Sequence, residues 1–159
     1  MKILQYLFIS LSHKILKILP YRLIRLLSVP IGTLYFLLTF RSSIKLFKRR
    51  KIFEKLKINY KPLIVKINYT RYWLETLWLT NKNFSKHITP HVEIENQEYV
   101  DKLKKQYPGL IFALPHLGNW EFAIPIGNSI KLNLLAVAEP LSNSYVLNWF
   151  KSLRESLGI

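Results

Sequence analysis

The sequence predicts an α/β fold in which membrane-associated helices precede a domain with mainly parallel strands. The first 60 residues are apolar and basic at once, which is typical of a helical region at a membrane. After Thr89, short apolar runs typical of buried strands alternate with helical stretches. The links between them are short, as in a βαβ unit, so we expect a parallel sheet with right-handed crossovers.

The positive charge of the chain is concentrated in its N-terminal third. The formal net charge is +15, and residues 1–62 hold fourteen Lys or Arg against one acid, Glu54. Leu and Ile surround these charges, so an anionic membrane surface suits the segment better than nucleic acid, whose readers expose basic residues on a polar face. The chain has no cysteine, which excludes disulfides and thiolate metal sites.

Two apolar stretches open the chain. Residues 1–20 hold no acid and have apolar residues on every face, which predicts a helix lying in a membrane interface. Residues 26–40 carry no charge and are flanked by basic residues, but fifteen residues span only about 22 Å of a ~30 Å hydrocarbon core. Because Pro30 and Gly32 interrupt this stretch, we expect a re-entrant or interfacial hairpin. A buried helix of an ordinary globular protein remains the alternative.

Basic helices and an aromatic helix follow. Residues 41–60 are basic and predicted to be helical, and Pro62 stands where a helix can start. Residues 63–80 carry aromatic side chains on most turns, which favours a packed face over an aromatic membrane belt.

The remaining elements are predicted in chain order. They are a strand at 91–95, a helix at 97–107 capped by Asn96, a strand at 110–114, a helix at 118–130 interrupted by Pro125, a strand at 132–138 and a helix at 142–158 ending at Gly158.

The candidate site is the loop that leaves the strand at 110–114. His116 lies in this loop, Gly118 permits a tight turn, and Glu121 falls in the first helical turn, where free amide groups favour its ionised form. Glu121 could accept a hydrogen bond from one imidazole nitrogen while the other nitrogen takes a proton from a hydroxyl nucleophile. A structural histidine is the alternative, and the two interpretations are equally supported. His13, His87 and His91 are interpreted as packing or surface residues.

The segments "LPHLGNWEFA", "VAEPL", "WFKSLRESLGI" and "RYWLETLWL" resemble the lysophospholipid acyltransferase superfamily. Within it, the chain is similar to the bacterial lipid A biosynthesis acyltransferase family, and most similar to its phosphatidylinositol mannoside acyltransferases. The resemblance runs from about residue 45 to the end, and its most specific part is the histidine followed, after four residues, by an acid.

The resemblance implies acyl transfer from acyl-CoA or acyl carrier protein to a glycolipid hydroxyl, without a cofactor or metal. It implies that His116 is the general base, that Glu121 orients it and that Arg154 lies at the acyl-donor site. Residues 1–60 would be the membrane-associated region and residues 61–159 the N-terminal part of a glycerolipid-acyltransferase-like α/β domain. The implied location is the cytoplasmic face of the inner membrane, with membrane lipids as partners and no nucleic acid.

Two departures from the family pattern stand out. Relatives often carry an arginine near Glu139 and Pro140, and this chain does not. Relatives are about twice as long, so we expect a truncated chain whose isolated product has little activity. The alternative function is a non-catalytic, membrane-anchored interaction protein that completes its sheet against another chain.

Overall fold

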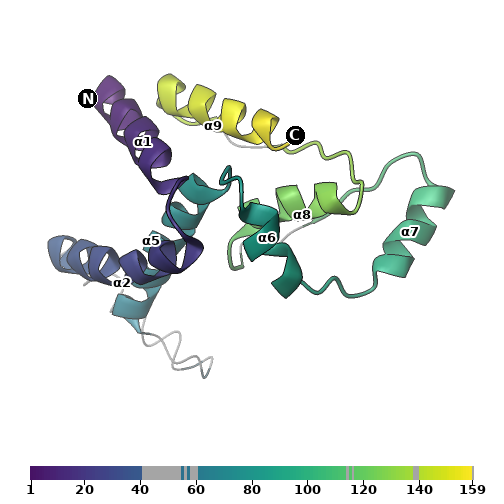
Figure 1. Ribbon diagram of the computed structural model, residues 1–159, viewed down its shortest axis with the longest axis horizontal. Coiled ribbons are helices and arrows are strands. Elements are labelled where there is room, and N and C mark those ends of the chain that lie inside the picture. The colour runs from purple at the N-terminus through teal and green to yellow at the C-terminus, as the bar shows by residue number, and fades with distance from the viewer. Residues whose placement is uncertain are drawn as a thin grey trace.

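The computed structural model describes residues 1–40, 55, 57, 61–113, 115, 117–137 and 140–158, and all regular secondary structure among them is helical (Figure 1). The elements are α1 (Lys2–Leu16), α2 (Tyr21–Leu38), α5 (Pro62–Trp78), α6 (Phe84–His87), η1 (Thr89–His91), α7 (Gln97–Gln106), η2 (Trp120–Phe122), α8 (Ala123–Ser129) and α9 (Ser144–Ser156). The predicted α/β class is therefore wrong: the described residues contain no strand.

The segments predicted as strands at 91–95, 110–114 and 132–138 form no strand in their described residues. Ile111, Leu135 and Val137 are 101%, 95% and 99% exposed, although their apolar runs were interpreted as buried strands. A strand needs a hydrogen-bonded neighbour, and a parallel sheet needs helices on both faces. Neither condition holds among the described residues, so apolar composition alone does not produce strands there.

The first helix is shorter than predicted, because α1 ends at Leu16 and not at Pro20, whereas α2 is longer and uninterrupted. Pro20 separates α1 from α2 and precedes the first residue of α2, a position where its fixed φ fits a helix start. Pro30 lies inside α2, which continues past it to Leu38. The predicted break at Pro30 and Gly32 is wrong, because an internal proline removes one backbone hydrogen bond without having to end the helix.

α1 and α2 expose many large apolar side chains. By length and composition α2 could cross a membrane, which is weak evidence because a core helix or a signal sequence passes the same test. The exposed residues of the two helices are Ile3, Leu4, Leu7, Phe8, Leu11, Ile15, Leu23, Leu26, Val29, Ile31, Leu34, Leu37 and Leu38.

α5 is the central helix, and α2 crosses it closely (Figure 1). Pro62 stands at the first position of α5, as predicted. A Cβ added at Gly32 of α2 would lie 2.6 Å from Ile67 Cα of α5, so the two backbones meet at this glycine. Lys66 of α5 lies over the ring of Tyr35 of α2, 4.2 Å from its centroid. Close backbone approach and this cation–π contact hold the pair together.

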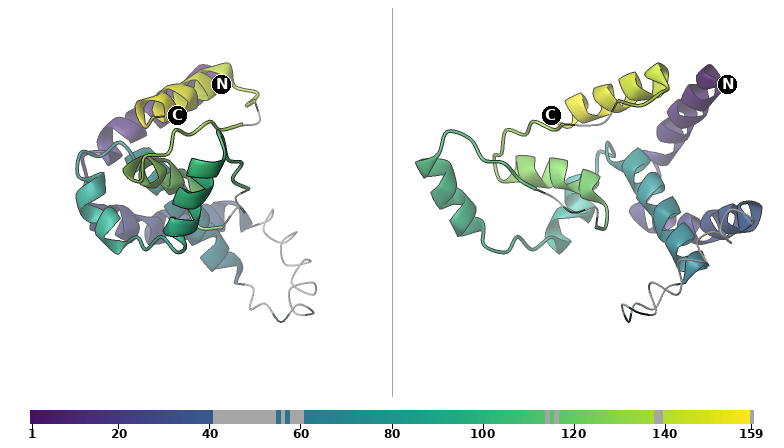
Figure 2. Two further views of the ribbon diagram at one scale, coloured as in Figure 1. Left: turned by 90° about the vertical axis from the view of Figure 1, so that its right-hand side faces the viewer. Right: turned by 180° about the vertical axis from the view of Figure 1, so that it is seen from behind.

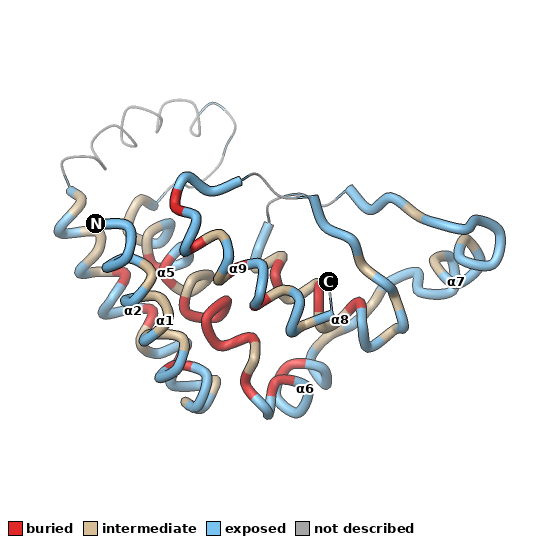
Figure 3. The backbone as a smooth tube through the Cα atoms, turned by 90° about the horizontal axis from the view of Figure 1, so that it is seen from above, coloured by how far each residue is buried: buried red, intermediate tan, exposed pale blue. Residues whose placement is uncertain are grey.

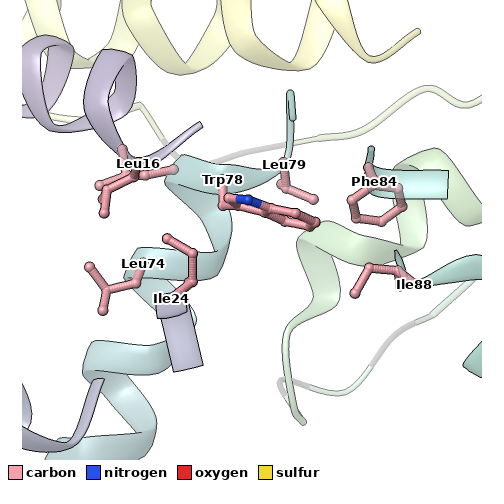
Figure 4. Packing of buried hydrophobic residues seen from close by; sticks show 8 residues of the cluster. Leu16, Ile24, Leu74, Trp78, Leu79, Phe84 and Ile88 are labelled. Carbon is pink, nitrogen blue, oxygen red and sulfur yellow. The ribbon is translucent and has the colours of Figure 1, made fainter. Parts of the chain in front are cut away.

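The main core surrounds the C-terminal end of α5 (Figure 4). Trp78 is fully buried among Ile24, Leu74, Phe84 and Ile88, and buried residues gather along α5 in Figure 3. The indole Nε1 of Trp78 donates to Leu19 O at 2.8 Å, in the turn between α1 and α2. For Trp78, the packed-face interpretation of the aromatic helix is confirmed.

α9 lies beside α1 and forms a second, smaller cluster (Figure 2). Val146, Phe150 and Leu153 of α9 are buried, with Trp73 of α5 packed against them. The side chain of Asn143 accepts from Tyr145 N–H and donates to Lys2 O at 3.0 Å, so it caps α9 and binds α1. The helices of the basic region thus pack directly on the rest of the chain.

The predicted helices at 97–107, 118–130 and 142–158 are confirmed as α7, η2 with α8, and α9. The predicted cap by the Asn96 side chain is wrong, because Asn96 precedes α7 in a left-handed conformation and its side chain accepts no helix amide; α7 buries no residue. Pro125 does not interrupt α8, because it falls in the first turn, where amides lack helical partners anyway. Gly158 follows α9 with a φ of +93°, the backbone conformation that favours glycine after a helix. The predicted helix over 41–60 lies outside the described residues, except for residues 55 and 57.

His13 joins three helices. Its Nδ1 donates to Leu77 O at 2.8 Å, Nε2 lies 3.4 Å from Thr80 Oγ1, and the ring meets Trp149 edge-on at 5.4 Å. The prediction of a packing role for His13 is confirmed. Burial lowers the pKa of His13 below 6.5, and nearby Lys17 lowers it further, against the Leu77 hydrogen bond.

Gly32→Ala tests the close crossing of α2 and α5. The added methyl must displace the α5 backbone, so we expect a loss of about 1–3 kcal/mol in the free energy of unfolding, despite alanine's better helix propensity. The measurement is denaturant unfolding in mild detergent. Gly109→Ala is the control, because a Cβ there meets nothing within 4 Å. Equal stability of the two variants would contradict the crossing.

The pKa of His13 predicts acid sensitivity of the helix junction. Because the folded state lowers this pKa, the unfolded state takes up the proton first as the pH falls through 6.5, and stability then decreases until the folded-state pKa is passed. We expect the melting temperature to fall from pH 7.5 to pH 5.5 by more in the wild type than in His13→Gln. An identical pH profile for the two proteins would show that His13 is not in this environment.

Candidate functional site

A capped turn carries the candidate site. Gly118 has a φ of +62°, and Asn119 precedes η2 with its side-chain oxygen accepting from the amide of Glu121 at 3.2 Å. Glycine adopts positive φ without steric cost and asparagine is a preferred helix cap, so these residues set the turn locally. The predicted tight turn at Gly118 and helix start before Glu121 are confirmed.

Glu121 and Arg154 form a buried ion pair. Arg154 Nη2 donates to Glu121 Oε1 at 2.6 Å and Nε donates to Oε2 at 3.3 Å. Glu121 is 2% exposed, and the Arg154 side chain is 26% exposed. The hydrogen bonds that Arg154 donates to Glu121 raise the pKa of Arg154, although burial opposes this. The pair therefore fixes η2 against α9.

A second carboxylate, Glu75, connects the turn to α5 and α2. Asn119 Nδ2 donates to Glu75 Oε2 at 3.2 Å, and Tyr21 Oη donates to Glu75 Oε1 at 3.0 Å. Asn119 Nδ2 also reaches Tyr72 O at 3.4 Å. Glu75 is buried, and these donors compensate its lost hydration. One asparagine thus caps η2 and binds α5.

A pocket of about 490 Å³ opens between α5 and the turn. Its walls mix aromatic rings with amide, carboxylate and guanidinium groups, a combination suited to a ligand with polar and flat parts. The residues that line it are Asn68, Tyr69, Arg71, Tyr72, Glu75, Gly118, Asn119 and Trp120.

Tyr72 lies between the ion pair and this pocket. Its ring is 4.6 Å from that of Trp120, centroid to centroid. Burial raises the pKa of Tyr72 to about 12, and the negative charge of Glu121 contributes. The phenol is therefore neutral at physiological pH and can donate a hydrogen bond.

The structure brings two of the three predicted site residues together and does not describe the third. Glu121 and Arg154, predicted as the orienting acid and a donor-site residue, contact each other directly. His116 lies outside the described residues, as does Glu139. No group of three or more possible metal ligands occurs in the described part of the chain.

Sequence reasoning missed the wall that α5 contributes. Asn68, Arg71, Tyr72 and Glu75 are spaced i, i+3, i+4 and i+7, so they share one helical face. That polar stripe was the signal available in the sequence. It was overlooked because the aromatic residues of the segment dominated its interpretation.

Comparison with known proteins identifies one family. A model of the bacterial lipid A biosynthesis acyltransferase family matches the chain over residues 1–159. No protein of curated function and no solved structure matches the chain.

Neutralising one member of the buried pair tests its contribution to the fold. In Glu121→Gln the Arg154 guanidinium loses its counter-charge, and we expect a loss of about 3–5 kcal/mol in the free energy of unfolding. The matched control is Glu155→Gln, which removes the exposed pair with Lys151 and costs about 0–1 kcal/mol. Chemical denaturation measures both, and a Glu121 variant no less stable than the control would argue against the pair.

Proposed function

The chain belongs to the bacterial lipid A biosynthesis acyltransferase family, and we propose that it transfers a fatty acyl chain from acyl-CoA or acyl carrier protein to a hydroxyl of a glycolipid. The acceptor would be a lipid A precursor or a phosphatidylinositol mannoside. Membership of the family implies acyl transfer of the lipid A type. The donor, the acceptor and the catalytic base are the parts that we propose.

The observation that carries the proposal is the buried Glu121–Arg154 pair beside a pocket lined by residues 118–120. His116 precedes Gly118 by two residues in the sequence, so the proposed base falls next to the turn that the pair anchors. Such anchoring matters because a general base must be held within hydrogen-bond reach of the proton that it removes.

In the proposed reaction, His116 takes the proton from the acceptor hydroxyl as its oxygen attacks the thioester carbonyl. The new C–O bond forms, the C–S bond breaks, and the proton passes from His116 to the departing thiolate. A carboxylate offers about four acceptor sites, so Glu121 keeps capacity for the imidazole while it binds Arg154. Arg154 has five N–H donors, of which Glu121 takes two, and the others can bind donor phosphate or the developing oxyanion.

A place at the inner membrane fits this reaction, because its acceptor is a lipid. The exposed apolar side chains of α1 and α2 stand close in sequence to Lys14, Lys17, Arg22 and Arg25. Apolar surface with adjacent basic side chains binds anionic bilayers through burial and charge together. We propose that α1 and α2 hold the protein on the cytoplasmic face, near its lipid substrate.

A second candidate function is a non-catalytic, membrane-anchored interaction protein. The exposed apolar side chains of segments 110–113 and 132–137 favour it, because contiguous apolar surface often marks a binding site for another chain. This candidate needs no chemistry at His116, and the same assay therefore separates the two functions.

The decisive experiment is acyl transfer by purified protein in mixed micelles, with labelled acyl-CoA or acyl carrier protein and each acceptor class. We expect His116→Ala to lower kcat by about 10²–10⁴-fold, the range for loss of a general base. His91→Ala is the matched control, since His91 is exposed on η1, and it should keep full turnover. Full turnover by the His116 variant excludes this base. Lack of turnover by the wild type with every donor and acceptor favours the interaction protein.

A further inference from the structure

Arg71 is a cationic group of the pocket that has no partner among the residues that the structure describes. It lies on α5 and lines the pocket, and no hydrogen bond or ion pair joins it to any described residue. Its Nε is buried and lacks an acceptor. A partly buried guanidinium that has lost water without gaining a partner is costly, and an anion beside it removes that cost.

The neighbouring carboxylate does not serve as that partner. Glu75 stands one turn after Arg71 on the same helix, but its two oxygens accept from Asn119 and Tyr21. No ion pair links Arg71 to Glu75 in the described structure. The positive charge of Arg71 is therefore available to a ligand, whereas Glu75 is already held by two neutral donors.

The other walls of the pocket suit a phosphate ester carried on a flat or polyhydroxylated body. Tyr69, Tyr72 and Trp120 offer aromatic faces and Asn68 offers an amide, whereas the Asn119 amide is already bound to Glu75 and to Tyr72 O. Tyr72 can add an O–H donor because its phenol is neutral. Arginine recognises phosphate through paired N–H donors, and aromatic rings stack on sugars or bases beside it.

We propose that Arg71 is a phosphate-binding residue and that this pocket holds a phosphate group of one of the two substrates. The inference rests on the proposed acyl transfer for the identity of those substrates. Two sources share this chemistry: the phosphates of the acyl carrier and a phosphate on the glycolipid acceptor. The site is distinct from the Arg154 guanidinium, which does not line this pocket.

Binding without turnover is the first test. Calorimetry compares coenzyme A, glucose 1-phosphate and unphosphorylated glucose on the wild type, Arg71→Gln, Arg71→Lys and Lys86→Gln. We expect Arg71→Gln to weaken at least one phosphate probe about tenfold or more, to leave glucose unchanged, and Arg71→Lys to restore part of the affinity. Lys86 is exposed and does not line the pocket, so its variant should bind as the wild type does.

Kinetics then distinguish the two sources. If the carrier phosphate is bound, Arg71→Gln raises KM for acyl-CoA but not for an uncharged acyl-N-acetylcysteamine donor. If the acceptor phosphate is bound, KM rises for a phosphorylated acceptor and not for its dephosphorylated form. In both cases we expect kcat to change little. A loss of folded protein would lower the apparent kcat, so an unchanged kcat shows that the substitution affects substrate binding.

The failure of this inference can be told apart from failure of the proposed function. If the protein transfers no acyl group but Arg71→Gln weakens phosphate binding, the phosphate site is supported and the proposed reaction is rejected. If the protein transfers acyl groups but Arg71→Gln changes neither the affinities for the phosphate probes nor the KM values, the phosphate site is rejected and the proposed reaction is supported. If Arg71→Gln does not fold, Arg71→Lys provides the test, because lysine cannot offer paired N–H donors to a phosphate. Wild-type affinity of Arg71→Lys for both phosphate probes would overturn the proposal that Arg71 binds phosphate through paired donors.

Discussion

The contact between Glu121 and Arg154 joins the turn that carries the candidate site to the last helix of the described chain. A carboxylate exposed to only 2% would lose several kcal/mol of hydration if it stood alone, and a two-point contact with a guanidinium compensates much of that loss. Such a pair constrains geometry more than it adds stability. It keeps η2 in one orientation, and with it the residues that immediately precede η2.

The helix α5 connects this turn to the rest of the molecule. One of its faces supplies Leu74 and Trp78 to the main core, and another supplies Arg71, Tyr72 and Glu75 to the pocket. Through Asn119, the hydrogen bonds of the turn continue to Glu75 and on to Tyr21 of α2. The pocket, the core and the N-terminal helices are therefore mechanically connected by a single helix.

This connection bears on how a lipid-directed reaction could be organised. α2 crosses α5 at Gly32, and the apolar side chains that α2 does not bury in this crossing face outward. If α1 and α2 bind a bilayer, the pocket on α5 stands at a defined position relative to that bilayer. Only the headgroup of a lipid acceptor would then need to leave the bilayer surface and enter the pocket. A phosphate on that headgroup, bound by Arg71, would orient it. In this arrangement the cationic and aromatic walls recognise the substrate, and the segment containing His116 is left to do the chemistry.

Arg154 was selected through the family resemblance and not from the residues themselves, and its pairing with Glu121 was not predicted. Sequence alone determined the helices at 97–107 and 142–158, the start of α5 at Pro62 and the turn at Gly118. These features depend on local rules, such as helix periodicity, the fixed φ of proline and the freedom of glycine to adopt positive φ, which act within a few residues. The domain boundary at residue 60 and the role of His116 stay predictions. The strands were wrong because an apolar run becomes a strand only when another segment pairs with it, and none does so among the described residues. Tertiary packing decided which residue pairs with Glu121, that the polar face of α5 forms a pocket wall, and that Arg71 has no partner among the described residues. These features depend on which residues distant in sequence come within hydrogen-bond reach.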